Sequence, residues 1–427
     1  MKKVLLVMGL VMLLSLGLVA GQVEEIKAAD EVEEITVWIP GDEVEYSFFY
    51  KMFKEYEKVN ENVEFKVEQQ PWGDYWTKLP LELQSGRGPE LFMAHTAYSD
   101  VLLPNSKELP FEVSELEKRF NNPGIFVGEN GKPVFIPVVY YGSVMYYNVD
   151  HWQEAGLTEK DIPKTWDQLE EVAQKLTVYD GEKVVRAGFD YSTWYTLADL
   201  IYQQGQGLVD ENGETTIDSE AGVNVLERIN KWEDDLRISD FTLGNGSPED
   251  SFLRYQSSII YGHAWMANWF AATDEELNFE AFPIPVWSQD APVITRADME
   301  LTFGISKNVN DKQYEVLVDF TEFVLNNDQI MLDIANGFSG VSSRKDLVGE
   351  GKDTSTVNAI NAQMDKMIPM VLPREYETVI RQTMEEVAVM DLSVEDALSN
   401  AVQQLSLSDL TSVNYYEEKY EHADQLK

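Results

Sequence analysis

The chain of 427 residues contains no cysteine. This absence excludes disulfide bonds, thiolate metal ligands and any lipid anchor that needs a thiol. Histidine is scarce as well, with four residues dispersed along the chain, so the sequence contains no histidine-rich metal motif. We therefore expect no resident metal and no cofactor, and we expect stability to come from the size of the hydrophobic core.

Common enzyme signatures are missing too. The sequence has no Gly-x-Ser-x-Gly nucleophile motif, no glycine-rich phosphate loop ending in Lys-Ser/Thr and no His-Glu-x-x-His pair. Carboxylates are so abundant that counting them identifies no particular glycosidase pair. We expect a protein without catalytic residues, and a secreted glycoside hydrolase or lectin stays open as an alternative.

Basic residues are few compared with acidic residues. The chain has 33 Lys and Arg against 75 Asp and Glu, which gives a formal net charge of −42. Such a surface repels nucleic acid and anionic lipid, so neither is expected as a partner. Because the carboxylates are spread along the whole chain, we interpret them as a solubility adaptation, for instance to high salt.

Long apolar runs are absent except at the N-terminus. Lys2 and Lys3 precede an uncharged run that closes on the small residues Ala20 and Gly21, as signal peptides do. We predict a cleaved signal peptide over residues 1–21 and a mature protein in the periplasm or outside the cell. A retained N-terminal anchor is the alternative.

The rest of the chain alternates between strand-like and helix-like segments. Strands are expected at residues 33–40 and 63–70, with an aromatic-rich helix at 45–60 between them. This rhythm predicts an α/β fold with parallel sheets, and the length predicts two lobes. Ligands of such sheets bind beyond the carboxyl ends of the strands. The residues that follow the strands are Gly41, Asp42, Trp72, Asp74, His95 and Thr96.

Several later segments carry local signals. Thr165 is expected to cap a helix that ends near Thr177, and Ser393 an amphipathic helix near the C-terminus. A strand is expected at residues 299–306. Residues 210–220 combine an Asn-Gly turn with acidic side chains, which favours a hairpin over a calcium loop because the remaining ligands are missing.

Four blocks, in order, resemble the extracellular solute-binding proteins of ABC importers, in the maltose-binding-protein-like branch that mostly carries sugars. The most specific block is Phe135–Thr177, in which "YYNVDHW" is followed by "PKTWDQLEEVAQKLT". The other blocks are "SGRGPELFMAHTAY" (85–98), "SSIIYGHAWMANWF" (257–270) with a following "FPIP", and "KQYEVLVDFTEFVLNNDQIMLDIANGFSGVSSRKDL" (312–347).

The resemblance implies a type II periplasmic-binding-protein fold, with two lobes that each hold a mostly parallel sheet flanked by helices. It implies a first lobe of residues 32–141 plus 294–343 and a second lobe of 142–293 plus 344–427. The expected hinge crossings lie near residues 140–143, 293–298 and 340–344. It further implies a monomer that clamps a mono- or oligosaccharide by hinge closure, as periplasmic binding proteins do, and delivers it to a membrane permease.

The chain departs from the family pattern at several points. Glu90 replaces the usual Asp, and Ser342 or Ser343 stands where Pro usually precedes Arg344. Charged residues in "RADMELTFGIS" (296–306) replace a frequent Gly-Gly. The missing cysteine differs from the lipoprotein members, so a freely diffusing periplasmic protein is the simplest expectation.

Binding an uncharged sugar requires aromatic rings for its C–H faces and polar groups for its hydroxyls. The expected ligand contacts are Asp42, Trp72, Asp74, His95, Tyr141, Tyr191, Trp194, Trp265, Arg296, Glu300, Arg344 and Tyr376. A place in the core is the alternative for every aromatic candidate. Trp166 and Trp232, at helical spacing, are expected in the core.

Tyr140 and Tyr141 are adjacent, as in ferric-ion binding proteins of the same architecture. In a strand their side chains point to opposite faces, so Tyr141 is expected to line the cleft alone as a hydrogen-bond donor. The sequence does not place a His or carboxylate set beside them. A non-sugar solute, such as a polyamine, a polyol phosphate or ferric ion, stays open as the alternative ligand.

Overall fold

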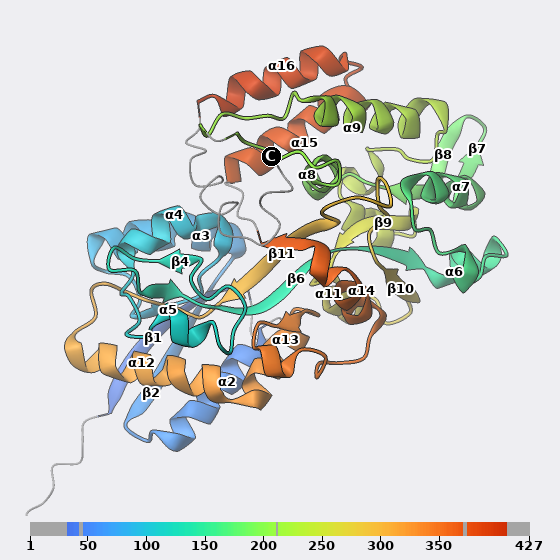
Figure 1. Cartoon of the computed structure of the whole chain (residues 1–427). Helices are drawn as coiled ribbons and strands as arrows, with labels where there is room; N and C mark the ends of the chain where they lie inside the picture. The colour runs from blue at the N-terminus through green and yellow to red at the C-terminus, as the bar shows by residue number, and fades with distance from the viewer. Residues whose placement is uncertain (1–31, 42–45, 211, 370–373, 408–427) are drawn as a thin grey trace, which may run out of the picture.

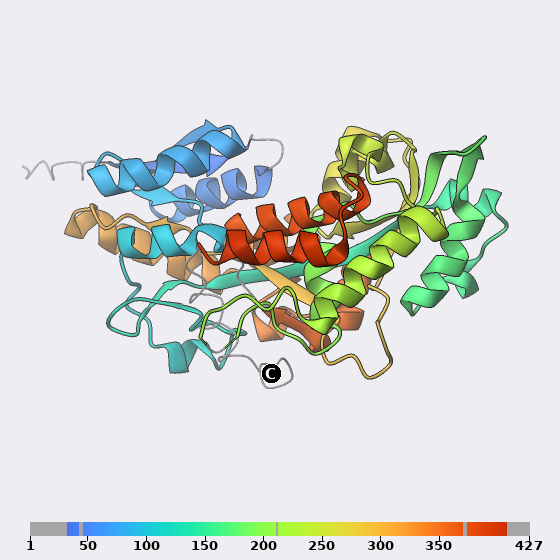
Figure 2. The same ribbon diagram turned by 90° about the horizontal axis from the view of Figure 1, so that it is seen from above.

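A computed structural model describes residues 32–41, 46–210, 212–369 and 374–407 (Figure 1). Figures 1 and 2 show an elongated molecule of two α/β lobes, joined where β6 and β11 run from one lobe into the other. The predicted signal peptide (1–21) and Asp42 lie outside the described residues. In the described part of the chain, no helix has the length and apolar character needed to cross a membrane.

The first lobe is built on a four-stranded sheet in the order β12-β3-β1-β2. Its strands are β1 (Glu33–Pro40), β2 (Val63–Gln70), β3 (Leu91–Phe92) and β12 (Gly304–Ile305). β1 pairs in parallel with β2 and β3, and β12 pairs antiparallel with β3. The strands predicted at 33–40 and 63–70 are confirmed. The strand predicted at 299–306 is divided, because Thr302 and Phe303 separate β11 from β12.

The helices of the first lobe cover this sheet. They are α2 (Ser47–Val59), α3 (Trp72–Ser85), α4 (Ser99–Leu102), α5 (Val113–Leu116), α12 (Asp311–Asn326) and α13 (Asp328–Gly337). A small two-stranded sheet of β4 (Phe126–Val127) and β5 (Pro133–Phe135) lies beside them. α2 buries Phe49, Phe53 and Tyr56, which share one helical face, against rings such as Phe65 and Phe320.

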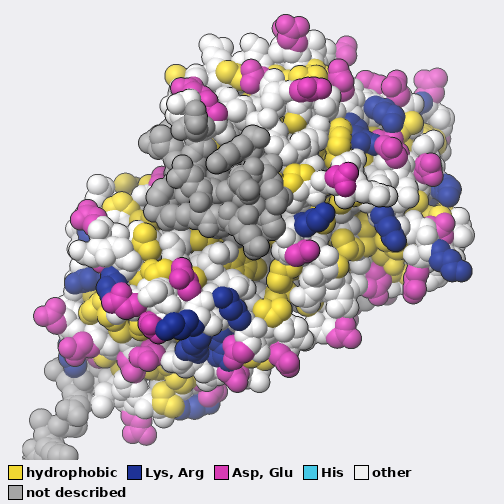
Figure 3. All heavy atoms as spheres, viewed as in Figure 1, with side chains coloured by type: hydrophobic (Ala, Val, Ile, Leu, Met, Phe, Trp, Pro, Cys, Tyr) yellow, Lys and Arg dark blue, Asp and Glu magenta, His cyan; other side chains and the backbone are white. Residues whose placement is uncertain are grey.

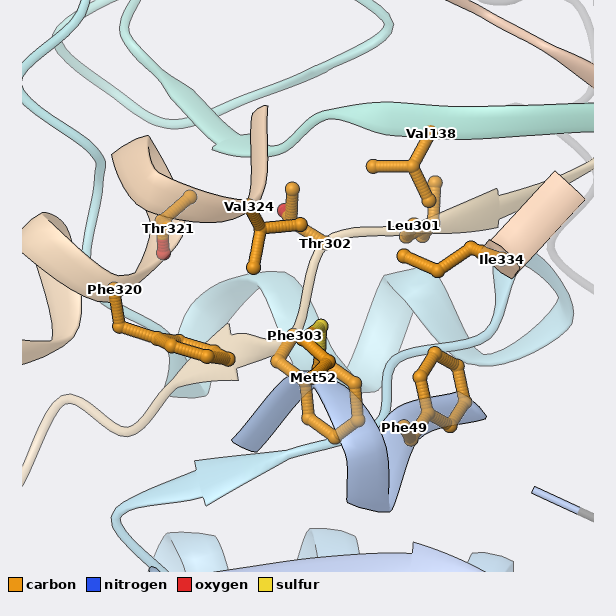
Figure 4. A pocket seen from close by; sticks show the side chains of 10 residues that line it. All are labelled: Phe49, Met52, Val138, Leu301, Thr302, Phe303, Phe320, Thr321, Val324 and Ile334. Carbon is orange, nitrogen blue, oxygen red and sulfur yellow. The ribbon is translucent and has the colours of Figure 1, made fainter. Parts of the chain in front are cut away.

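A cavity of about 10 Å³ remains within this core (Figure 4). Its lining consists of Phe49, Met52, Val138, Leu301, Thr302, Phe303, Phe320, Thr321, Val324 and Ile334. A space of this size is at the lower limit for one water molecule and its walls are mostly apolar. It is therefore a packing defect of the core and not a site for a solute.

The second sheet has eight strands, with the path β14-β11-β6-β9-β8-β7 and with β10 and β13 also paired to β6. Its strands are β6 (Pro137–Asn148), β7 (Val178–Asp180), β8 (Lys183–Asp190), β9 (Ser257–His263), β10 (Phe279–Phe282), β11 (Thr295–Leu301), β13 (Val341–Ser342) and β14 (Met367–Pro369). Within this second sheet, the described strands pair in parallel at β8–β9 and β11–β14, and the other pairs are antiparallel. This differs from the expected mostly parallel sheet, because β6 carries the chain out of the first lobe while β11 and β13 run in the opposite direction beside it.

Nine described α-helices surround the second sheet. They are α6 (Val149–Glu154), α7 (Trp166–Leu176), α8 (Trp194–Tyr202), α9 (Glu220–Asn230), α10 (Pro248–Leu253), α11 (Met266–Thr273), α14 (Ser355–Gln363), α15 (Arg374–Ala388) and α16 (Val394–Leu405). Thr165 and Ser393 cap α7 and α16 as predicted, and Trp166 and Trp232 are fully buried as predicted. The hairpin at 210–220 is confirmed by the bridge between Val209 and Thr215.

The three segments expected to cross between the lobes lie side by side. Gly142 of β6 pairs with Ala297 of β11, and Tyr140 of β6 pairs with Val341 of β13. The strands approach closely at Gly142, where a Cβ atom would lie 2.7 Å from the Arg296 carbonyl oxygen. Glycine is therefore required at this point of the interlobe connection.

Acidic side chains are dispersed over the face of the molecule that Figure 3 shows. Figure 3 shows Asp and Glu scattered over the visible face, with Lys and Arg interspersed among them. This distribution agrees with the dispersal of carboxylates along the sequence.

Candidate functional site

A cleft of about 770 Å³ separates the two lobes. This volume falls within the ~300–1,000 Å³ that ligand pockets usually occupy. The described lining residues are Gly41, Tyr46, Phe48, Trp72, Met93, His95, Thr96, Ala97, Tyr141, Trp194, Tyr195, His263, Trp265, Asn268, Trp269, Ala272, Arg296, Asp298, Glu300, Gly337, Phe338 and Glu377. One wall comes from α2, α3 and the segment after β3, and the other from α8, α11 and α15. The strands β6 and β11 form the floor.

Indole rings stand on both walls of the cleft. Trp72, at the start of α3, is 44% exposed, and Trp269 of α11 is 38% exposed. Trp265 lies four residues before Trp269 on the same helical face, with 6.2 Å between the ring centroids. Trp72 is held edge-on against Trp76 and His95. These rings offer flat apolar surfaces on opposite sides of one space.

The floor is charged because alternate residues of β11 face the cleft. Arg296, Asp298 and Glu300 occupy these positions and all three line the cleft. The Arg296 guanidinium lies 4.2 Å from the centroid of the Trp194 ring. Its nitrogens are 3.5 Å from Asp199 Oδ1 and 3.6 Å from Asp298 Oδ1. Burial disfavours the Arg296 cation, but these two carboxylates outweigh it and raise its pKa.

Asp298 is also paired with His263 of β9, whose Nε2 lies 3.0 Å from Asp298 Oδ2. Burial opposes the charge on Asp298, but Arg296 and the hydrogen bond from His263 outweigh it and hold the pKa of Asp298 at about 2. Because an ionised carboxylate only accepts, His263 Nε2 is the donor. The other ring nitrogen of His263, Nδ1, has no hydrogen-bond partner among the described residues.

Glu300 is 1% exposed and sits at the end of the same row. Tyr141 donates its hydroxyl to Glu300 Oε2 over 3.3 Å, while Oε1 has no hydrogen-bond partner in the described part of the chain. Burial raises the pKa of Glu300 well above its usual range, which favours the neutral form of the carboxyl. Burial likewise lowers the pKa of His95, which accepts the Ala97 N–H on Nδ1 and keeps its proton on Nε2.

The floor is anchored from behind by Asp199 of α8. Its Oδ2 accepts hydroxyl hydrogen bonds from Ser143 (2.9 Å), Tyr261 (2.7 Å) and Thr295 (2.6 Å). Its Oδ1 accepts the backbone N–H of Arg296 over 3.1 Å. One buried carboxylate thus connects β6, β9 and β11 directly beneath the cleft.

The structure brings together seven of the residues predicted to contact ligand. These seven line the cleft: Trp72, His95, Tyr141, Trp194, Trp265, Arg296 and Glu300. Tyr141 is separated from Tyr140 as expected, because Tyr140 points away and donates to the Asn121 carbonyl. Ligand contact by these side chains stays a prediction. Asp42 lies outside the described residues.

Four predicted contacts lie away from the cleft lining. Asp74 is on α3 with its side chain 64% exposed, turned toward Lys78 at 4.0 Å. Tyr191 is buried in the second-lobe core and donates to Glu233 over 2.7 Å. Tyr376 is fully buried and donates to the Leu208 carbonyl over 2.6 Å.

Arg344 is the fourth of these corrected contacts. Its guanidinium is buried and binds the carboxylates of Asp328 and Asp346, the latter over 2.8 Å. Both of its charge partners come from the protein, so this arginine serves the fold rather than the cleft.

Other cleft residues are absent from the predicted contacts. They are Gly41, Tyr46, Phe48, Met93, Thr96, Ala97, Tyr195, His263, Asn268, Trp269, Ala272, Asp298, Gly337, Phe338 and Glu377. The sequence contains a signal for two of them. Asp298 lies between Arg296 and Glu300 at the spacing of one strand face, and Trp269 follows Trp265 at the spacing of one helix face.

Comparison with known proteins identifies the family. The family model described as "Bacterial extracellular solute-binding protein" matches residues 40–331. The chain belongs to this family. A maltooligosaccharide ABC transporter solute-binding lipoprotein of Streptococcus pneumoniae is 29% identical over 65% of this chain and 67% of its own length. An arabinooligosaccharide-binding protein of Bacillus subtilis is 23% identical over 66% of this chain and 67% of its own length. The chain thus spans about two-thirds of the length of these relatives.

The fold is shared with solved structures of low sequence identity. The maltose/maltodextrin-binding domain of Bdellovibrio bacteriovorus, bound to maltotriose, superposes with a TM-score of 0.71. The two are 16% identical, and the match covers 88% of this chain and 99% of that domain. The expected two-lobe α/β architecture is therefore confirmed.

Proposed function

We propose that the protein captures a mono- or oligosaccharide between its lobes outside the cytoplasm and delivers it unaltered to an ABC-transporter permease. The observation that carries this proposal is the interlobe cleft, in which exposed indoles on both walls face polar groups on the floor. The relatives named for arabinooligosaccharide and maltooligosaccharide binding support the same class of solute.

The proposed contacts divide by chemistry. Trp72, Trp265 and Trp269 stack on the C–H faces of sugar rings. Tyr141 and Glu300 on the floor bind hydroxyls. The cleft volume of about 770 Å³ lies in the upper part of the ~300–1,000 Å³ range of ligand pockets, which leaves room for more than one sugar ring. An oligosaccharide is therefore favoured over a monosaccharide.

The proposed mechanism is closure of two lobes around the solute. Residues 32–141 with 294–343 form one lobe, and residues 142–293 with 344–407 form the other. A solute that contacts both walls binds the closed form more tightly and shifts the equilibrium toward it. The close pairing of β6 with β11 and β13 provides the connection about which the lobes move.

The proposed location follows from the N-terminal sequence and the family. Residues 1–21 act as a cleaved signal peptide, and the mature monomer is periplasmic or extracellular. Without a cysteine it carries no thiol-linked lipid, so it reaches the permease by diffusion.

Calorimetry and tryptophan fluorescence with arabino-, malto- and manno-oligosaccharides test the proposal. We expect saturable binding at a ratio of one solute per chain, and recovery of the solute unchanged by chromatography. Absence of binding to every saccharide refutes it. Turnover of a chromogenic glycoside supports the hydrolase alternative instead.

A further inference from the structure

The described residues that line the cleft include more acidic than basic side chains. Among the described residues that line it, one guanidinium, Arg296, stands with three carboxyl groups, Asp298, Glu300 and Glu377. Asp199 and Asp298 already approach the Arg296 nitrogens to 3.5 and 3.6 Å, and the Trp194 ring covers one face. The single positive group is therefore compensated within the protein, and the floor has no spare positive charge for an anionic solute.

Three polar side-chain atoms on the floor, Glu300 Oε1, His263 Nδ1 and Arg296 Nε, have no hydrogen-bond partner within the described structure. Glu300 and His263 are each 1% exposed. Unpartnered buried polar atoms cost free energy, so native proteins satisfy nearly all of them. Since these side chains line the cleft, a solute bound there is within their reach.

Tyr141 contacts both Glu300 and His263. Its hydroxyl donates to Glu300 Oε2 over 3.3 Å, and its ring meets the His263 ring edge-on at 5.2 Å. The Tyr195 ring lies 5.0 Å from the His263 ring. The unpartnered Glu300 Oε1 thus lies in a space with aromatic walls, which suits a cationic donor because ring faces attract cations.

We propose that this floor, formed by Glu300, His263 and Asp298, is a subsite for an ammonium group, so that the solute captured by the proposed cleft is an amine-bearing sugar. This inference rests on the proposed function and names its substrate class. An ammonium has three donors and no acceptor, so it can donate to the unpartnered Glu300 Oε1 and to the neighbouring Asp298 carboxylate. A uronic acid would place its charge against Asp298 and would be repelled.

The protonation of Glu300 agrees with this assignment. Its raised pKa describes a buried carboxyl that has no adjacent cation. An arriving ammonium supplies that cation and allows Glu300 to ionise, which releases one proton. The other titratable groups near Glu300 are Tyr141 of β6, Asp298 of β11, His95 after β3 and Tyr75 of α3.

The test compares matched solutes by calorimetry. The probes are disaccharides and trisaccharides of glucose, glucosamine, N-acetylglucosamine and glucuronate, together with spermidine. We expect the glucosamine forms to bind at least tenfold more tightly than the glucose forms, and the glucuronate forms to bind worst. Measurements in two buffers of different ionisation enthalpy are expected to show release of about one proton with glucosamine and none with glucose.

Two variants test whether Glu300 causes the preference for glucosamine and the release of a proton. Glu300→Gln keeps the shape of the side chain but cannot ionise, and it is expected to remove the tenfold preference and the proton release. Asp74→Asn removes an exposed carboxylate outside the cleft and is expected to change neither. Circular dichroism of both variants checks that they fold.

The outcomes separate this inference from the proposed function. Equal affinity for glucose and glucosamine forms overturns the ammonium subsite and leaves sugar binding intact. Binding of spermidine without any saccharide keeps the subsite but refutes the sugar assignment. A preference for glucosamine that persists unchanged in Glu300→Gln overturns the assignment of the floor.

Discussion

Replacing Asp199 by Asn tests what holds the floor of the cleft in place. The side chain is fully buried and accepts four hydrogen bonds, three on Oδ2 and one on Oδ1. Asparagine has the same shape but only one acceptor atom. Whichever way the amide turns, its NH₂ group faces either the three hydroxyls or the Arg296 N–H.

The expected cost follows from these bonds. With the amide oxygen toward the hydroxyls, three charge-assisted bonds become neutral ones, at a loss of about 1 kcal/mol each. The Arg296 N–H loses its acceptor, which costs about 1–3 kcal/mol more. Removing the desolvation penalty of a buried carboxylate offsets part of this sum. We expect a net loss of about 3 kcal/mol in the free energy of unfolding.

Urea unfolding followed by tryptophan fluorescence measures this loss, with Asp235→Asn as the control. Asp235 is exposed, so its replacement is expected to change the free energy of unfolding by less than about 0.5 kcal/mol. A loss below about 1 kcal/mol in Asp199→Asn would show that the buried carboxylate is not the anchor that the hydrogen bonds indicate.

Three further predictions follow from the structure. Trp265→Ala removes a stacking surface and is expected to weaken oligosaccharide binding about tenfold by calorimetry; an unchanged Kd contradicts the stacking role. Burial raises the pKa of Glu233 from 4.5 to about 8, so its contribution to stability is complete below pH 4.5 and lost as pH rises toward 8. Glu233→Gln is expected to flatten that fall in thermal melts across this range, and an unaltered pH dependence refutes it. Since the net charge is −42, raising NaCl is expected to raise the melting temperature, and a constant value contradicts the charge argument.

Local sequence patterns predicted correctly the strands and helix starts whose formation depends on neighbouring residues alone. The apolar pattern placed β1 and β2, and the hydroxyls of Thr165 and Ser393 placed the starts of α7 and α16. The directions of the strands in the second sheet were not accessible in this way. They depend on which distant strand lies beside β6, and its neighbours β9 and β11 begin more than a hundred residues later in the chain.

The site was harder to predict than the fold because the same residue types occur in the core and in the cleft. Tyr191 and Tyr376 are aromatic and near strand or helix ends, yet each is buried and bound to a protein partner. Asp74 was expected beside Trp72, but α3 begins at Trp72 itself. Two residues along a helix correspond to a rotation of about 200°, which turns Asp74 to solvent.

The most informative segment of the sequence was residues 296–300. β11 carries Arg296, Asp298 and Glu300 there, and strand alternation directs all three to the cleft floor. These side chains create an arginine that is compensated by two carboxylates and a buried carboxyl with one unpartnered oxygen. A site built around specific polar groups rejects analogues that leave them unpaired. Specificity for the solute is therefore expected to reside at β11.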